Sequence, residues 1–359
     1  MATAMQPLRI LSAASQVAAH LRSAIKAGRW AETIPGIEFL AAELDVNRKT
    51  VDAALKQLER DGVIVGQGPG RARRIVRSNG HSTRPIRIAM LPYEHEDLFL
   101  SYIVDLQHSL AEAGHTVITA KKSLVALEMD PKRIQRLVEQ TPADAWIVMA
   151  GSSEVLEWFA GQPIPAFALF GRRGGIPIAG TGPEKGTALA VATRTLVELG
   201  HRRIVLLCRS ERRKPSPGIT ESAMLAELAA HGIPTSEYNL PDWEETREGF
   251  RELLSSLFRV TPPTALVIGI GTFYTPTLQF LAMRGLQVPE QVSLVCTDPD
   301  PGFAWCAPTV AHIRWEAKPI VRRIVQWAKN VSLKRKDVKQ TFTAAEFVPG
   351  GSIGPALNG

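Results

Sequence analysis

The chain has 359 residues, of which 45% are hydrophobic and 21% charged, an ordinary globular composition with enough apolar material for two or three packed domains. The apolar runs are far too short to span a bilayer, and Met1–Gln16 has no basic segment followed by an apolar one, so we expect a cytoplasmic protein. Positive charge is concentrated near the start, because residues 1–80 hold 12 Lys and Arg against 7 Asp and Glu, whereas the rest holds 30 against 28. A small, strongly basic part indicates a surface that binds phosphates.

The stretch from Leu40 to Val76 predicts two short helices joined by a tight turn at 44–46, followed by a hairpin. Asn47 is a favoured N-cap for the second helix. The apolar face of that helix consists of Val51, Ala54, Leu55 and Leu58, at spacings of i, i+3, i+4 and i+7. Arg48 and Lys49 lie in its first turn, which is where a recognition helix contacts the major groove of DNA. The hairpin has a glycine-rich tip at 66–70 and adds a second basic arm, so this part reads as a winged helix-turn-helix.

The runs VAAHLRSAIKAGRW, LAAELDVNRKTVDAALKQLERDGVI and GQGPGRARRIV resemble the DNA-binding domain of GntR-type bacterial transcription regulators. Two positions depart from that family: Glu38 stands where an arginine is usual, and Asp52 stands where a basic residue is common. Repulsion from phosphate makes both substitutions costly unless the side chains face away from DNA. The resemblance and the basic helix together predict these DNA-binding residues: Asn47, Arg48, Lys49, Thr50, Gln67, Gly68, Arg71 and Arg73.

Beyond Val76, a polar stretch marked by Gly80 and Pro85 reads as a linker. We therefore predict a DNA-binding domain at 1–77, a linker at 78–85 and a second domain at 86–359. The three cysteines, Cys208, Cys296 and Cys306, show no CxxC spacing and lie in or beside apolar runs, which predicts reduced, buried thiols.

From residue 86 onward the pattern alternates between strands and helices. Strands are expected at 86–91, 116–119, 145–149, 165–169, 204–208, 265–268 and 292–296, and helices at 99–113, 131–140, 154–160, 187–199, 220–231, 244–258 and 276–284. This alternation predicts an α/β fold with two doubly wound lobes, each built on a parallel sheet covered on both faces. Ligands in such folds bind beyond the carboxyl ends of the strands.

The segments ELGHRRI (198–204) and RGLQVPEQVSLV (284–295) resemble the effector domains of LacI/GalR-type repressors, which share the periplasmic-binding-protein fold. A GntR-type head on such a domain resembles the architecture of arabinose-type repressors. The resemblance implies a small-molecule effector of a sugar-like kind that binds between two lobes. It implies no cofactor and no metal site.

The expected pocket departs from that family. Where an Asn-Asp pair commonly holds sugar hydroxyls, this chain has Ile270 and Gly271, and an arginine position aligns near Thr220. Asp298 matches an acid that the family keeps. The predicted ligand-binding residues are Tyr93, Glu94, Phe99, Phe273, Asp298 and Trp305, with Trp315 nearby. Each of these could instead be an ordinary packing residue between the lobes.

Two charged runs invite other interpretations. Tyr93-Glu94-His95-Glu96-Asp97 could suggest a metal cluster, but contiguous residues rarely converge on one ion, so a solvated loop is expected. Glu211-Arg212-Arg213-Lys214 could bind an anionic effector, although a mobile, solvated loop is the favoured interpretation.

We conclude from the sequence that the chain is a homodimeric transcription regulator, a repressor whose effector changes lobe closure and so the spacing of two DNA-binding heads. One alternative is a sensor domain that has lost its ligand and serves only for dimerisation. Another is a DNA-tethered enzyme, but the sequence lacks the motifs GxSxG, HExxH and GxxxxGK[ST].

Overall fold

The computed structural model describes the chain except for residues 1–11, 27, 69–70, 76–83 and 358–359. Its contacts divide the chain into two compact units, Met1–Ser82 and Thr83–Gly359, which we call the head and the core domain. The predicted linker at 78–85 and the start of Met1–Gln16 fall largely outside the described residues, so the predicted domain limits stay predictions. In the part of the chain that is described, no helix is long and apolar enough to cross a membrane.

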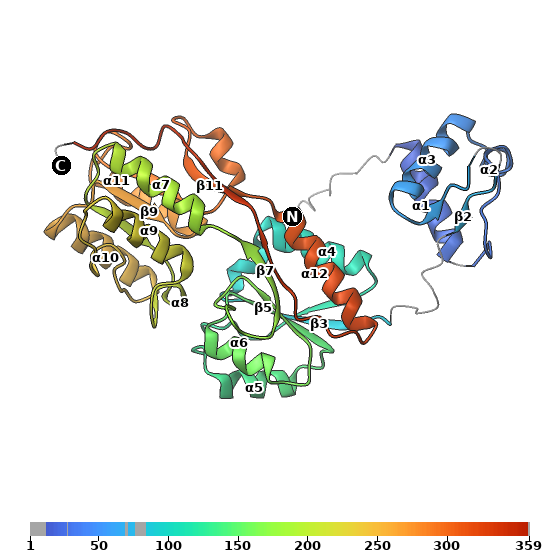
Figure 1. Ribbon diagram of the computed structural model, residues 1–359, viewed down its shortest axis with the longest axis horizontal. Helices are drawn as coiled ribbons and strands as arrows, with labels where there is room; N and C mark the ends of the chain where they lie inside the picture. Colours follow the sequence, from blue (N-terminus) through green and yellow to red (C-terminus); the bar gives the residue numbers. More distant parts are fainter. Residues whose placement is uncertain (1–11, 27, 69–70, 76–83, 358–359) are drawn as a thin grey trace, which may run out of the picture. The chain divides into compact units, whose positions relative to one another are not determined.

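The head consists of three helices and a short antiparallel hairpin (Figure 1). Its elements are α1 (Ala13–Lys26), α2 (Ile37–Leu44), α3 (Arg48–Arg60), β1 (Ile64–Val65) and β2 (Arg74–Ile75). The core of the head includes Leu21, Ile34, Leu40, Val51, Ala54, Leu55, Leu58 and Ile64. The apolar face predicted for the second helix is therefore the face that α3 buries.

The turn between α2 and α3 depends on two polar residues. Asp45 adopts the left-handed conformation with φ 49°, which short polar side chains tolerate better than most. Asn47 then caps α3, because its side-chain oxygen accepts a hydrogen bond of 2.8 Å from the backbone amide of Lys49. The predicted turn and cap are confirmed.

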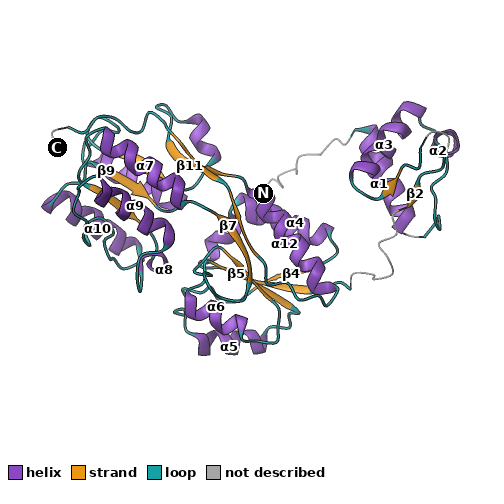
Figure 2. Cartoon of the chain, in the orientation of Figure 1, coloured by secondary structure: helices purple, strands orange, loops and turns teal. Residues whose placement is uncertain are grey.

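The first lobe of the core domain is a parallel sheet in the order β12-β7-β6-β5-β3-β4 with helices on both faces (Figure 2). In chain order it contains β3 (Arg87–Leu91), the 3-10 helix η1 (His95–Phe99), α4 (Ser101–Glu112), β4 (Thr116–Thr119), α5 (Pro131–Gln140), β5 (Ala145–Met149), α6 (Ser153–Ala160), β6 (Ala166–Leu169), β7 (Ala179–Pro183) and, much later, α12 (Ala317–Ser332) and β12 (Gln340–Thr343). Along β3, Ile88 and Met90 enter one apolar cluster while Ala89 and Leu91 enter the other. This alternation shows why a strand covered on both faces is a continuous apolar run.

The second lobe has a five-stranded sheet in the order β13-β11-β10-β9-β8. It contains α7 (Gly186–Glu198), β8 (Ile204–Leu207), α8 (Ser210–Arg213), α9 (Ile219–Ala230), α10 (Arg247–Val260), β9 (Ala265–Ile268), η2 (Gly271–Phe273), α11 (Tyr274–Met283), β10 (Ser293–Cys296), η3 (Pro301–Trp305), β11 (Ala311–Trp315) and β13 (Ala345–Val348). The strands are parallel except β13, which pairs antiparallel with β11. The predicted two-lobed α/β fold is confirmed, with this antiparallel edge as an addition.

The chain passes between the lobes at three places within residues 84–357, after β7, after β11 and after β12 (Figure 1). Several elements near these crossings were not predicted, namely β7, α12, β12 and β13. β7 has the sequence AGTGP, and glycine and proline are depleted in strands, so its place in the sheet depends on neighbours rather than on local preference.

The cysteine prediction was correct for two thiols and wrong for the third. All three cysteines are free, and Cys208 and Cys296 are buried, but Cys306 is exposed. Cys306 follows η3 instead of lying within a strand, and its thiol donates only to the Gly302 carbonyl at 3.5 Å.

Candidate functional sites

The first candidate site is the exposed start of α3 in the head. Arg48 forms an ion pair with Glu38 of α2, and both side chains are exposed. Lys49 is exposed beside it and takes part in no ion pair among the described residues. Glu38, the acid that departs from the GntR pattern, therefore neutralises the first arginine of the predicted recognition helix.

The second part of the head site is the hairpin. Gln67, Gly68 and Arg71 are exposed, as a DNA-contacting wing requires. Arg73 differs, because its Nε lies 2.8 Å from an oxygen of Glu59 and its Nη2 lies 3.8 Å from Asp52, both on α3. The structure thus turns Arg73 toward the body of the head, and it balances the unusual acid Asp52.

The core domain's most highly charged candidate site lies between its lobes, around Arg209, two residues past the end of β8. The Arg209 guanidinium donates to both carboxylate oxygens of Asp97, at 3.0 and 2.9 Å, and to Glu94 at 3.1 Å. It also lies over the ring of Tyr93, with its central carbon 4.1 Å from the ring centroid. A buried guanidinium of the second lobe is therefore held by two acids and an aromatic ring of the first.

A second group of contacts extends this interlobe cluster. Tyr93 donates its hydroxyl hydrogen to Glu245 at 2.5 Å, and Glu245 accepts another hydrogen bond from the backbone amide of Ser210. Arg172, in the loop after β6 of the first lobe, donates to the backbone carbonyls of Glu211 and Ser216 in the second. The lobes are thus joined by directed polar contacts as well as by the three chain crossings.

Glu211 is the unusual member of this cluster. It is only 9% exposed, and its Oε2 atom has no hydrogen-bond partner among the described residues. Burial raises the pKa of Glu211 to about 7, although Arg209 opposes the shift. A buried carboxylate oxygen without a donor is costly, so this atom is a natural place for a ligand or a proton.

Asp298 follows β10 and lies by the crossing after β7. It forms an ion pair with Lys185 and accepts a hydrogen bond of 3.4 Å from the indole of Trp315. Burial opposes ionisation of Asp298, but Lys185 outweighs it and lowers the pKa of the carboxyl. The Trp315 ring packs edge-on against Tyr102 and Phe170 of the first lobe.

Only some of the predicted ligand-binding residues lie at the contacts between the lobes. Tyr93 and Glu94 join the Arg209 cluster, and Asp298 has the setting just described. Phe273 stacks on Phe250 within the second lobe. Phe99 and Trp305 are 81% and 91% exposed and are not brought into the cluster.

Two loop interpretations were wrong. Tyr93 and Asp97 are buried, and η1 carries a capping box between Glu94 and Asp97 instead of forming a solvated loop. The run 211–214 lies in α8 and its cap, where Glu211 and Arg213 are buried. Each interpretation failed because charges buried between lobes are paired across chain distances that a local pattern does not reveal.

Sequence reasoning missed Arg209 and named Arg212 only as part of a charged run. Arg209 was not singled out, although it lies two residues past the carboxyl end of the buried strand β8. In this fold the carboxyl ends of the strands face the ligand cleft. Arg212 donates to Glu221 at 2.6 Å and to the Gly269 carbonyl at 2.5 Å. It therefore brings a guanidinium beside Thr220, where the sequence had suggested that none was present.

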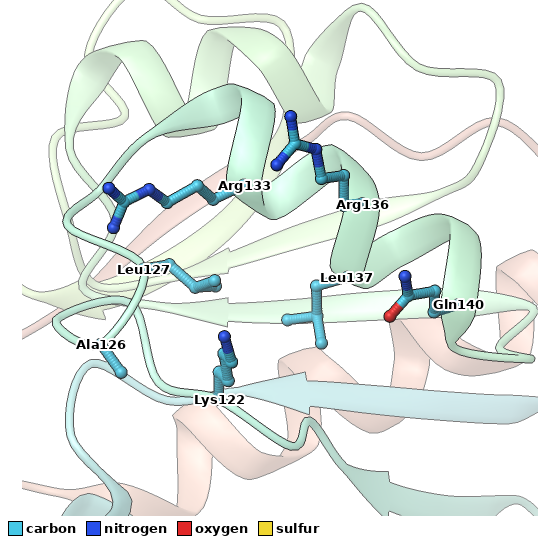
Figure 3. Close-up of a pocket in the computed structure, with 7 residues that line it drawn as sticks. All are labelled: Lys122, Ala126, Leu127, Arg133, Arg136, Leu137 and Gln140. Carbon is cyan, nitrogen blue, oxygen red and sulfur yellow. The ribbon is translucent and has the colours of Figure 1, made fainter.

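A separate hollow of about 340 Å³ lies on the first lobe, beside α5 (Figure 3). It is lined by Lys122, Ala126, Leu127, Arg133, Arg136, Leu137 and Gln140. The three cations are all exposed, and Arg133 already pairs with Glu128 at 2.5 Å. We assign no ligand to this hollow, since exposed cations are well solvated without one.

Comparison with protein families accounts for both units. Residues 13–72 match the family described as "Bacterial regulatory proteins, gntR family", and residues 193–353 match "Periplasmic binding protein-like domain". No curated protein matches the sequence.

Solved structures with the same fold include LacI-family transcription regulators. The Escherichia coli transcriptional repressor ascG is 18% identical, with a TM-score of 0.55, over 75% of this chain and 99% of that one. A LacI-family regulator from Enterococcus faecium with bound ribose is 15% identical, with a TM-score of 0.59, over 75% and 99% of the two chains. The regulator CelR in complex with cellobiose is 16% identical, with a TM-score of 0.60, over 89% and 100%.

The fold and the head together define a DNA-binding transcription regulator. Its N-terminal part is a GntR-type helix-turn-helix domain, and its C-terminal part is a periplasmic-binding-protein-like domain with the fold of LacI-family regulators.

Proposed function

We propose that the protein is a cytoplasmic, homodimeric repressor and that a small-molecule effector bound between the lobes controls its affinity for DNA. The head binds an operator half-site through Asn47, Arg48, Lys49 and Thr50 at the start of α3. The wing residues Gln67, Gly68 and Arg71 are the second part of that interface, whereas Arg73, also predicted there, ties the hairpin to α3. Paired core domains place two heads on the two halves of a pseudo-palindrome.

The observation that carries effector control is the ion pair between Asp97 of the first lobe and Arg209 of the second, at 2.9 Å. Both side chains are buried, so the pair holds only when the lobes are close together. A ligand that competes for either partner changes the balance between open and closed lobes. Reversing that balance fully requires about 5 kcal/mol of differential affinity between the two states.

The same contact supports one alternative. Because Arg209 already occupies the acids of the first lobe, the chain itself stabilises a closed arrangement, as a ligand-free dimerisation platform would require. The relatives that match are regulators, and we propose no catalytic activity. Under this alternative, changes in the Arg209 cluster alter folding stability but no small molecule alters DNA affinity.

The test begins with the full-length protein and fragments of its own genome. Fragments that the protein retains define the operator, and light scattering of the complex gives the number of chains bound. We expect two chains on one inverted repeat, and a fluorescence titration then measures operator affinity with and without small molecules. A single chain bound to an unrepeated site would contradict the dimer, and operator affinity that no metabolite changes would favour the ligand-free platform.

A further inference from the structure

The interlobe cluster contains more acids than bases. Glu94 and Asp97 come from the first lobe, and Glu211 and Glu245 from the second. Arg209 is the cation shared by the first-lobe acids. Arg213 lies 3.6 Å from Glu245, but it also pairs with Asp242.

Two buried atoms of this cluster have no hydrogen-bond partner among the described residues, an acceptor of Glu211 and a donor of Arg209. Glu211 Oε2 is buried and has no hydrogen-bond partner within the described residues. Arg209 Nε, a donor, is also without a partner there, but the same guanidinium makes three hydrogen bonds to carboxylates. The missing interaction of largest energy is therefore a donor, preferably cationic, for Glu211.

The nearby cations already have partners, which argues against an anionic ligand, and one of them, Arg172, donates to the backbone carbonyls of Glu211 and Ser216. Lys185 pairs with Asp298, and Arg212 pairs with Glu221 at 2.5 Å. An anion would have to separate these pairs and leave buried acids without partners, which is strongly unfavourable. A cation instead adds a donor for Glu211 Oε2, the carboxylate oxygen of this cluster that has no partner among the described residues.

The chain's own arginine shows what the first lobe can hold. Asp97 and Glu94 bind the edge of the Arg209 guanidinium, and the Tyr93 ring covers its face at 4.1 Å. Two carboxylates and an aromatic face form a binding site for a guanidinium or an ammonium group. Glu94 is 36% exposed, so one edge of the cluster is open to solvent.

We infer that the interlobe site binds a small organic cation, carrying a protonated amine or a guanidinium, which donates to Glu211 and competes with Arg209 for Asp97 and Glu94. This inference rests on the proposed effector function and names the chemical class of the effector. An oxygen close to the cationic group of the ligand would accept from Arg209 Nε. Binding of the cation loosens the Arg209 contact and so changes lobe closure.

The experiment uses the full-length protein and pairs of probes that differ mainly in charge. Putrescine is compared with 1,4-butanediol, and glucosamine with glucose, while glucuronate represents anions. Calorimetry measures binding, and a parallel titration measures operator affinity. We expect each amine to bind at least about ten-fold more tightly than its neutral counterpart and to change operator affinity.

Two variants locate the binding site. Glu211→Gln and Glu94→Gln should each weaken amine binding by about ten-fold or more, because each removes a charged acceptor. Glu157→Gln, on the exposed surface of α6, removes the same charge away from the cluster and should bind amines normally. Thermal unfolding establishes that each variant is folded, and Glu94, which is partly exposed, provides the readout if Glu211→Gln does not fold.

The outcomes separate this inference from the proposed function. If a neutral sugar or an anion binds and changes operator affinity while the amines do not, the cation site is overturned and effector control stands. If the amines bind equally well to Glu211→Gln, Glu94→Gln and the unaltered protein, the assigned location is overturned. If no probe binds or changes operator affinity, the cation site is overturned, and effector control fails as well only when the wider titration with metabolites also leaves operator affinity unchanged.

Discussion

The acid Glu38 changes how Arg48 of the head is available to bind DNA. Arg48 leads the predicted recognition helix, but its guanidinium pairs with Glu38 when DNA is absent. Binding a base edge or a phosphate therefore requires Arg48 to exchange one partner for another. This exchange makes DNA contact more selective, because a nonspecific phosphate must compete with a carboxylate that is already in place.

Substitutions of this pair should have opposite effects. We expect Arg48→Ala to weaken specific operator binding by roughly 1–3 kcal/mol if Arg48 contacts a guanine edge. Glu38→Gln should strengthen binding to all sequences and steepen its dependence on salt, because a paired cation is released. Titrations against operator and unrelated DNA at several salt concentrations measure both effects. Glu112→Gln, which changes the same net charge in the core domain, is the control.

Glu211 should make the stability of the protein depend on pH in an unusual direction. Burial raises the pKa of Glu211 from its ordinary value of 4.5 to about 7, and Arg209, Glu245 and Tyr93 are the groups around it. A carboxyl with a raised pKa binds more protons in the folded state than in the unfolded state, so it favours folding at low pH. That contribution is lost as pH rises through the folded-state pKa.

The variant Glu211→Gln tests whether Glu211 causes this pH dependence of stability. Between about pH 5 and pH 8, the free energy of unfolding of the unaltered protein should fall by roughly 1–3 kcal/mol relative to that of Glu211→Gln. Urea unfolding across this range measures the difference. Glu157→Gln should follow the unaltered protein, and parallel curves for Glu211→Gln and the unaltered protein would show that Glu211 has an ordinary pKa.

At the scale of elements, the two arginines Arg71 and Arg73 of the wing have different roles, one in DNA binding and one in holding the hairpin to α3. Arg71 lies exposed in the described part of the hairpin. Arg73 is bonded to Glu59 at 2.8 Å and so ties the hairpin to α3. The basic arm that the sequence presents as one group therefore contains residues with different roles.

Alanine at each position should separate these roles. Arg71→Ala should weaken binding to every DNA sequence and reduce the salt slope by about one unit, with little effect on stability. Arg73→Ala should lower the stability of the head by about 0.5–1 kcal/mol, because Glu59 and Asp52 lose a partly buried partner. Salt-dependent DNA titrations and thermal unfolding are the two measurements. Equal losses of DNA affinity without loss of stability would return Arg73 to the DNA interface.

For the core domain as a whole, the Asp97–Arg209 pair should govern lobe closure. The chain offers a close control, because Asp337 forms a similar two-bonded pair with Arg323 inside the first lobe. The two acids are almost equally buried, with side chains 9% and 8% exposed. Only the first pair, however, connects different lobes.

Asp97→Asn and Asp337→Asn should therefore cost similar stability, roughly 1.5–3 kcal/mol each, because each removes hydrogen bonds to a charged group. Asp97→Asn alone should also increase the radius of gyration in X-ray scattering and change operator affinity. If Asp337→Asn produces the same scattering and DNA-binding changes, the effect comes from lost stability and not from lobe closure.

Local chemistry was sufficient to predict much of this protein from its sequence. The apolar spacing of Val51, Leu55 and Leu58 predicted α3, and Asn47 predicted where it begins. Continuous apolar runs predicted the buried strands, since a strand covered on both faces needs apolar residues on both. These features depend on residues that are neighbours in the chain, the alternation of strands and helices predicted the two lobes, and the resemblance to known families added the expected effector between them.

The tertiary structure alone decided how the charges are used. Asp97 and Arg209 are 112 positions apart, and Glu38, which seemed only unfavourable for DNA, pairs with Arg48. β7 and β12 form strands because they pair with each other through Gly180 and Gln340, which compensates for a weak local preference. Charges act over a few ångströms in space regardless of chain distance. Only the folded arrangement therefore shows which acids are paired, and that Oε2 of Glu211 has no donor in the described part of the chain.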